Sequence, residues 1–316
     1  MKKIISFLYL LFIVKLAAFS QQDPQFTNYM EYKLGVNPGF AGIEGTISGI
    51  ILNRYQWEGF RGAPKTLIFS ANAAIDAFGS PGGIGINVVD DQIGFAKNTQ
   101  INVNYSYIKT LSFGNLGIGL SFGVFNQSIN GEWEIPEGNL GIFTPAESDP
   151  AIPQGDVSQM ALDAGFGLYL KSNRYYLGAS ATHINQASIK YDEVENYYLV
   201  RHYYLMGGYN IKLSDPLFVV QPSFLFKSDL AGWQLDLNTN VVFDERFWGG
   251  ITYRARDAIV LLLGMEMENG LRFGYSFDLV TSAIGRDGFG SHEIFVSYSL
   301  DLERSRTQKY KSIRFL

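Results

Sequence analysis

Residues 115–125 read NLGIGLSFGVF, and in this stretch apolar residues alternate strictly with small or polar ones. Leucine, isoleucine, phenylalanine and valine occupy the even positions, and asparagine, glycine and serine occupy the odd positions as far as Gly123. Because successive side chains of a β-strand point to opposite faces, one face of this strand suits lipid and the other a polar or tightly packed interior. Strands of this kind are typical of a transmembrane β-barrel.

The same alternation recurs along the chain, for example at residues 100–107, 233–238 and 271–279. It predicts an all-β chain that forms a transmembrane antiparallel β-barrel of about 14 strands. The expected strands are 45–57, 65–76, 82–90, 98–110, 115–126, 159–171, 174–183, 201–213, 217–227, 232–243, 246–256, 257–267, 270–279 and 291–301.

The connections between these strands fall into two sets. Those after even-numbered strands are short and rich in turn-forming residues, as expected of periplasmic turns. They are 112–114, 172–173, 214–216, 244–245 and 268–269. The other set is mostly longer, as expected of extracellular loops, and includes 58–64, 91–97, 127–158, 184–200 and 280–290. This alternation supports the strand count.

The first twenty residues predict a secretory signal peptide, with cleavage before Gln21. Two lysines precede the apolar run 4–14, and the small-residue site Ala18-Phe19-Ser20 follows. The chain thus divides into a signal peptide (1–20), an N-terminal periplasmic or lumenal segment (21–43), an outer-membrane barrel (44–301) and a basic periplasmic tail (302–316). We expect the outer membrane as the location, reached by signal-peptide-dependent export.

The N-terminal segment is expected to contain a short amphipathic helix. Asp23 followed by Pro24 is typical of a helix start, and Phe26, Tyr29, Met30 and Leu34 recur at helical spacing. This helix could pack inside the barrel mouth as a partial plug, or lie against the periplasmic rim.

Composition excludes several classes of function. The chain has no cysteine, so thiol chemistry, disulfides and cysteine metal sites are excluded. Its formal charge of −5 does not favour nucleic-acid binding. The three histidines, His183, His202 and His292, lie far apart in sequence and form no known catalytic or metal-binding motif. We expect no enzyme, no cofactor and no metal.

Charged residues occur on the face of the strands that would line the lumen. In lipid each arginine would be costly, whereas across the lumen the charges can pair, or alternatively line a selective pore. The candidate lumen-facing charges are Asp163, Asp236, Arg254, Glu266, Arg272 and Asp278.

Other polar residues lie where the loops and the tail are expected. The span 127–158 is acidic and proline-rich, which is consistent with a solvated flap or with a docking surface for a basic or calcium-loaded secreted partner. The candidate partner-contact residues in the loops are Arg61, Asp90, Asp91, Glu132, Glu134, Glu137, His292 and Glu293. For Asp90 and Asp91 structural capping is the alternative, and for His292 a strand-end hydrogen bond. The tail could touch an acidic periplasmic partner through Arg304, Arg306, Lys309, Lys311 and Arg314, or simply remain a flexible end.

Short motifs along the mature chain resemble, in order and spacing, those of the PorP/SprF family of outer-membrane proteins linked to type IX secretion. They are QQDPQFTNYM (21–30), NPGFAG (37–42), RYQW (54–57), GAPKT (62–66), DDQIG (90–94), YLG (176–178), HYY (202–204), GY (208–209), QPS (221–223), YR (253–254), DA (257–258), GYSFD (274–278) and GSHEI (290–294).

The resemblance implies a non-enzymatic outer-membrane component that binds, anchors or helps deliver a secreted surface protein such as an adhesin. It also implies contact with outer-membrane lipid and with peptidoglycan-associated parts of the secretion machinery. The alternative is a plugged channel or transporter for small solutes. An outer-membrane lipase-like enzyme has no support in the sequence.

Overall fold

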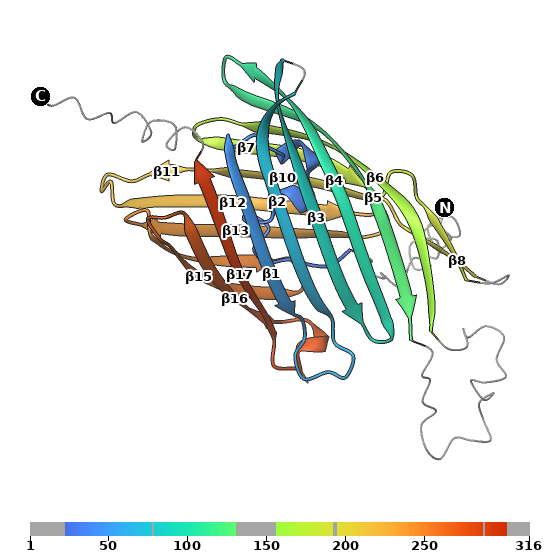
Figure 1. The fold of residues 1–316 in the computed structure, drawn as a ribbon. Helices are drawn as coiled ribbons and strands as arrows, with labels where there is room; N and C mark the ends of the chain where they lie inside the picture. The colour runs from blue at the N-terminus through green and yellow to red at the C-terminus, as the bar shows by residue number, and fades with distance from the viewer. Residues whose placement is uncertain (1–22, 78, 131–155, 192–194, 287, 302–316) are drawn as a thin grey trace, which may run out of the picture.

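The computed structural model describes residues 23–77, 79–130, 156–191, 195–286 and 288–301, which form one closed antiparallel barrel (Figure 1). Neighbouring strands pair in chain order, and the sheet closes where β1 (Thr46–Tyr55) pairs with β17 (Ser291–Asp301). Closure leaves no long sheet edge facing lipid, where unpaired backbone groups would be costly. Among the described residues, no helix is long and apolar enough to cross a membrane.

Fourteen strands make the wall of the barrel, as the sequence predicts. Between β1 and β17 they are β2 (Lys65–Ala77), β3 (Ser80–Ile93), β4 (Ala96–Leu111), β5 (Gly114–Ile129), β6 (Val157–Lys171), β7 (Tyr175–Thr182), β10 (His202–Tyr209), β12 (Phe218–Ser228), β13 (Trp233–Phe243), β14 (Phe247–Arg254), β15 (Ala258–Glu266) and β16 (Leu271–Val280). The two-residue β11 (Ile211–Lys212) continues β10, and β8 (Ser188–Tyr191) pairs with β9 (Glu195–Tyr198) in a separate hairpin.

The alternation in β5 appears in the structure as an outer and an inner face. Ile118, Leu120 and Phe122 point outward and are 37%, 43% and 62% exposed, as residues in contact with lipid must be. The intervening Gly117 and Gly119 face the lumen, where they contact the N-terminal segment.

The two ends of the barrel differ as expected. Short turns connect the strands at the end where β1 begins and β17 ends, which we call the turn end. The longer connections gather at the opposite end, the loop end. One expected loop was wrong: residues 91–97 are not a loop, because β3 and β4 pair as far as Ile93 and Ala96 and leave only Gly94 and Phe95 to turn.

Residues 23–44 lie inside the barrel and run from the loop half of the lumen to the turn end (Figure 1, blue). Of the two placements that the sequence left open, the structure shows the lumenal one. At the turn end Glu44 pairs with Lys171, and further in the Val36 carbonyl accepts a hydrogen bond from Ser180 Oγ at 2.6 Å. We call residues 23–44 the plug.

The plug is less helical than the sequence predicts. Its only α-helix among the described residues is α2 (Lys33–Val36), followed by the 3-10 turn η1 (Pro38–Phe40). The expected helix start at Asp23 was wrong, because the carboxylate of Asp23 accepts hydrogen bonds from Tyr204 and His183 on the barrel wall. Tertiary contacts here override the helical spacing of the apolar side chains.

Glycines on the inner face of β5 let the plug backbone approach the wall. A Cβ atom on Gly117 would lie 2.0 Å from the carbonyl oxygen of Gly39, and one on Gly119 would lie 2.2 Å from the carbonyl carbon of Pro38. Both distances are well inside van der Waals contact. The small residues of the sequence pattern therefore make room for the plug.

Replacing one of these glycines should disturb the plug. We expect Gly117→Ala to lower the free energy of unfolding by about 1–3 kcal/mol, because the backbone at Gly39 must move. Urea unfolding of the refolded barrel in lipid vesicles, followed by tryptophan fluorescence, measures this change. The matched control is Gly249→Ala, whose Cβ would lie 3.6 Å from the Leu262 carbonyl oxygen. Equal losses in the two variants would contradict the close contact with the plug.

Candidate functional site

Two buried arginines form the centre of a polar cluster in the loop half of the lumen. Arg54 on β1 and Arg254 on β14 both bind Asp278, with N–O distances of 2.7 and 2.6 Å. Arg54 also lies 3.1 Å from Glu293, and Arg254 lies 3.2 Å from Asp236. These five residues, each no more than 1% exposed, are called the arginine cluster below.

The arginine cluster holds the plug by direct hydrogen bonds. The backbone N–H groups of Thr27 and Asn28 donate to the Glu293 carboxylate at 2.9 and 2.8 Å. The hydroxyl of Thr27 donates to Asp278 and accepts from Arg54 and Arg254. The backbone at residues 27–28 therefore takes its acceptors from the wall rather than from a helix of its own.

The stability of the arginine cluster depends on every charged residue in it. Removing a charge from water is costly, and the cost is recovered only when every ion has a close partner of opposite sign. Three carboxylates here face two guanidinium groups, and the plug supplies further donors: the backbone of residues 27–28, the Thr27 hydroxyl and the Gln25 amide, which lies 3.3 Å from Asp236. The plug is thus part of what makes the buried charges stable.

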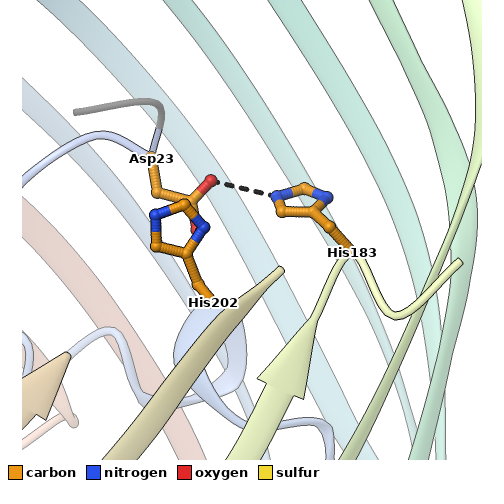
Figure 2. Close-up of side chains that lie close together, drawn as sticks. All are labelled: Asp23, His183 and His202. Atoms are coloured by element: carbon orange, nitrogen blue, oxygen red, sulfur yellow. Dashed lines mark hydrogen bonds and ion pairs between the residues drawn. The ribbon is translucent and has the colours of Figure 1, made fainter. Parts of the chain in front are cut away.

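A second polar cluster lies beside the N-terminal end of the plug (Figure 2). Nε2 of His183 lies 3.0 Å from Oδ1 of Asp23, and Nδ1 of the same ring lies 2.8 Å from Oδ1 of Asp163 on β6. Nδ1 of His202, the first residue of β10, lies 3.4 Å from Oδ2 of Asp23. We call Asp23, Asp163, His183 and His202 the histidine cluster.

The carboxylates make His183 strongly basic. Burial alone would lower the pKa of this imidazole, but Asp23 and Asp163 raise it to about 10. Burial would likewise raise the pKa of the Asp23 carboxyl, but the charge of His183, with contributions from His202 and Lys227, holds it well below its usual range. At neutral pH a buried imidazolium therefore bridges the plug and the wall.

The hairpin of β7 and β10 brings the two histidines together. His183 directly follows β7, and His202 pairs with Thr182 in the register of the hairpin. Sequence reasoning treated the histidines as distant because at least eighteen residues separate any two of them. The signal was nevertheless present, since each histidine lies at the loop-proximal end of an expected strand and those two strands are antiparallel neighbours.

The expected lumen charges all lie on the inside of the barrel. Asp236, Arg254 and Asp278 belong to the arginine cluster, and Asp163 belongs to the histidine cluster. Glu266 and Arg272 lie together nearer the turn end, where Arg272 also binds Glu31 of the plug at 2.9 Å. Sequence reasoning missed Arg54 and Glu31, which bind the expected charges Asp278 and Arg272, respectively.

The candidate partner-contact residues of the loops do not all lie on the surface. Asp91 lies in β3, 2% exposed, and accepts a hydrogen bond from Thr66; Glu293 is fully buried in the arginine cluster. Neither faces a partner outside the barrel, because β3 extends further than the sequence indicates and includes Asp91, and because the side chain of Glu293 is buried on the inner face of β17. Asp90 is partly exposed and pairs with Lys97, and His292 bonds Tyr275 and lies 3.3 Å from Glu58.

Several expected contact residues lie outside the described residues. They are Glu132, Glu134, Glu137 and the tail residues Arg304, Arg306, Lys309, Lys311 and Arg314. The signal peptide at 1–20 lies outside them as well.

Cavities occur at both ends of the barrel. At the turn end, a vestibule of about 750 Å³ lies below the plug and is lined by charged and aromatic side chains, including Lys33, Arg174 and Tyr176. At the loop end, a cavity of about 450 Å³ lies against the loop that connects β1 and β2, beside Arg61 and Phe60.

A family model for "type IX secretion system membrane protein PorP/SprF" matches residues 18–298, which is most of the chain. The chain belongs to the PorP/SprF family. The plug, the inner charges and the whole wall of this PorP/SprF protein as far as β17 fall within the matched residues. No curated protein matches the chain.

Solved structures with some similarity are also outer-membrane proteins. The outer membrane protein Omp33 of Acinetobacter baumannii is 6% identical, with a TM-score of 0.44 over 81% of this chain and 98% of its own. The β-domain of the Bordetella autotransporter BrkA is 11% identical, with a TM-score of 0.39 over 81% and 98%. A mutant porin of Rhodopseudomonas blastica is 10% identical, with a TM-score of 0.34 over 81% and 99%. These similarities are too low to support a function.

Loss of one cluster arginine should destabilise the barrel. We expect Arg254→Met to lower the free energy of unfolding by about 3–5 kcal/mol, because Asp236 and Asp278 lose a buried partner. Urea unfolding measures the change, and limited proteolysis should show earlier cleavage within the plug. The control is Arg246→Gln, which breaks a surface ion pair with Glu268 and should cost less than about 1 kcal/mol. A loss of less than about 1 kcal/mol for Arg254→Met would contradict the role of the cluster.

Proposed function

We propose that this protein is a non-enzymatic outer-membrane component of type IX secretion that binds and anchors, or helps deliver, a secreted cell-surface protein. Membership of the PorP/SprF family supports the secretion role. The filled lumen is the observation that favours binding over conduction. The plug crosses the barrel and is tied to its wall by two buried clusters, so a polypeptide has no free path through this conformation.

The cargo would then contact an end of the barrel rather than its interior. With the termini on the periplasmic side, the loop end faces the cell exterior. Its described surface includes the cavity beside Phe60 and Arg61 and the ring of Phe289, which is 77% exposed. Exposed aromatic residues beside a cavity and a charged rim are typical of protein-binding surfaces. Arg61, a candidate partner contact from the sequence, lines this cavity.

The turn end would face the periplasm and offers a second binding surface. The vestibule there is lined by Lys171, Arg174, Lys212 and Arg272 together with the acidic residues Glu31, Glu44, Glu245 and Glu266. A periplasmic part of the machinery, such as a peptidoglycan-associated protein, could dock against this rim. The basic tail expected at 302–316 would start from the same end.

The alternative is a channel for small solutes that opens when the plug moves. The size of the vestibule favours this alternative, since about 750 Å³ is enough for a small molecule. A solute would still have to pass the arginine cluster and the backbone of residues 27–28.

Deletion of the gene tests the two functions. We expect the deletion strain to lose from its surface one particular large exported protein, measured by quantitative mass spectrometry of surface-labelled cells. The purified barrel should show negligible conductance in planar bilayers. Unchanged surface proteins together with a large, steady, solute-selective conductance would favour the channel instead.

Variants of the loop end locate the binding surface. We expect the double variant Phe60→Ser/Phe289→Ser, expressed in the deletion strain, to retain about tenfold less cargo than the wild type, because exposed aromatic anchors carry much of the affinity of an interface. The control is Leu230→Ser, which removes an 81% exposed apolar side chain from the connection between β12 and β13 at the same end. Equal effects of the control and the double variant would refute this surface.

A further inference from the structure

We propose that Asp23, His183 and His202 form a binding site for a divalent transition-metal ion of the Zn²⁺ class, which clamps the N-terminal end of the plug to the barrel wall. The three side chains offer one ligand atom each, and these atoms all lie within 4.8 Å of one another. Figure 2 shows the three side chains converging from three separate segments of the chain.

The ligand atoms lie near the separations found around one tetrahedral ion, but each histidine faces a different oxygen of Asp23, so side chains must turn slightly for one oxygen to share an ion with both rings. Nε2 of His183 lies 3.0 Å from one Asp23 oxygen, and Nδ1 of His202 lies 3.4 Å from the other. Ligands bound to Zn²⁺ at about 2.0–2.1 Å lie at similar distances from each other. Two imidazoles and a carboxylate are a donor set that suits Zn²⁺ and its neighbours in the first transition row.

The second ring nitrogen of His183 strengthens the assignment. Asp163 accepts a hydrogen bond from Nδ1 at 2.8 Å, and Asp163 itself accepts one from Gln100 at 2.9 Å. A carboxylate behind a histidine is the usual arrangement around a metal-binding imidazole, because it fixes the ring and increases its basicity. Asp163 is thus a positioning residue for His183.

The burial of the two histidines and the small number of histidines in the chain also support the site. His183 and His202 are 3% and 4% exposed, and they are two of only three histidines in the chain. The ion would replace the proton now shared between His183 and Asp23, and also the hydrogen bond from His202 Nδ1 to the Val200 carbonyl. Lys227, whose ammonium lies 3.3 Å from the Asp23 carbonyl oxygen, opposes a cation.

Zinc binding to the purified full-length mature barrel in detergent tests the proposal. After treatment with a chelator and its removal, isothermal titration calorimetry and elemental analysis should give one Zn²⁺ per barrel. Co²⁺ should give the visible absorption of a tetrahedral complex. We expect Asp23→Asn, His183→Gln and His202→Gln each to weaken binding at least about tenfold, and Asp163→Asn about 10–100-fold.

Two further variants separate loss of the site from loss of the fold. His292→Gln removes the one histidine outside the cluster and should leave zinc affinity unchanged. Lys227→Met removes the nearby positive charge and should strengthen zinc binding, an effect that misfolding cannot produce. Zinc should also raise the midpoint of thermal unfolding of the wild type but not of His202→Gln, because an ion that binds only the folded state stabilises it.

Three results would overturn the proposal. The first is the absence of zinc binding in the wild type, which would leave the cluster as a proton-bridged tether alone. The second is binding that survives Asp23→Asn and His202→Gln. The third is binding that depends on His292.

Discussion

Backbone groups inside a membrane must all be hydrogen-bonded within the protein, and the rest of this structure follows from that constraint. It forces the sheet to close, which β1 and β17 achieve through a continuous antiparallel register. A barrel of fourteen strands encloses more space than its own inward side chains can fill. The chain fills that space with its own residues 23–44, and the inner face of β5 is reduced to glycine where the plug passes.

The backbone of the plug is buried in the lumen, so its N–H and C=O groups must also be hydrogen-bonded within the protein. The amides of Thr27 and Asn28 are buried and need acceptors, which Glu293 supplies, and the charge of Glu293 needs Arg54. Each buried charge needs a partner of opposite sign, so the ion pairs continue from Arg54 through Asp278 and Arg254 to Asp236. The result is a plug held by ionic contacts at its N-terminal end and by packing, hydrogen bonds and the Glu44–Lys171 pair toward its C-terminal end. The filled lumen supports our proposal that this protein acts by binding rather than by conduction.

The sequence predicts the barrel well, because lipid on one face and a packed lumen on the other impose a period of two on every strand. The strand count and the difference between the two ends follow from that period and from turn residues.

The plug is less predictable. Its apolar spacing predicts a longer helix, but the side chains that bind it come from β16, β17 and other strands distant in sequence. Asp91 was assigned to a loop for a related reason, since the ends of strands carry the weakest pattern. Glu293 lies within the expected strand 291–301, but its buried partner Arg54 is distant in sequence. The meeting of His183 and His202 could have been inferred from the pairing of their strands, whereas the arrival of Asp23 beside them could not.

Residues 23–44 occupy the lumen and are bound there at residues 27–28. Disulfide formation in native outer membranes tests this placement directly, because the wild-type chain has no cysteine. The side chains of Asn28 and Ser276 meet at 3.1 Å, so the pair Asn28→Cys and Ser276→Cys should cross-link in high yield within one chain. The pair Asn28→Cys and Ser106→Cys should not, because Ser106 lies against Gly39, toward the other end of the plug. Equal cross-linking of both pairs would contradict this position of the plug. So would the absence of cross-linking in the first pair although each cysteine reacts with a small thiol reagent.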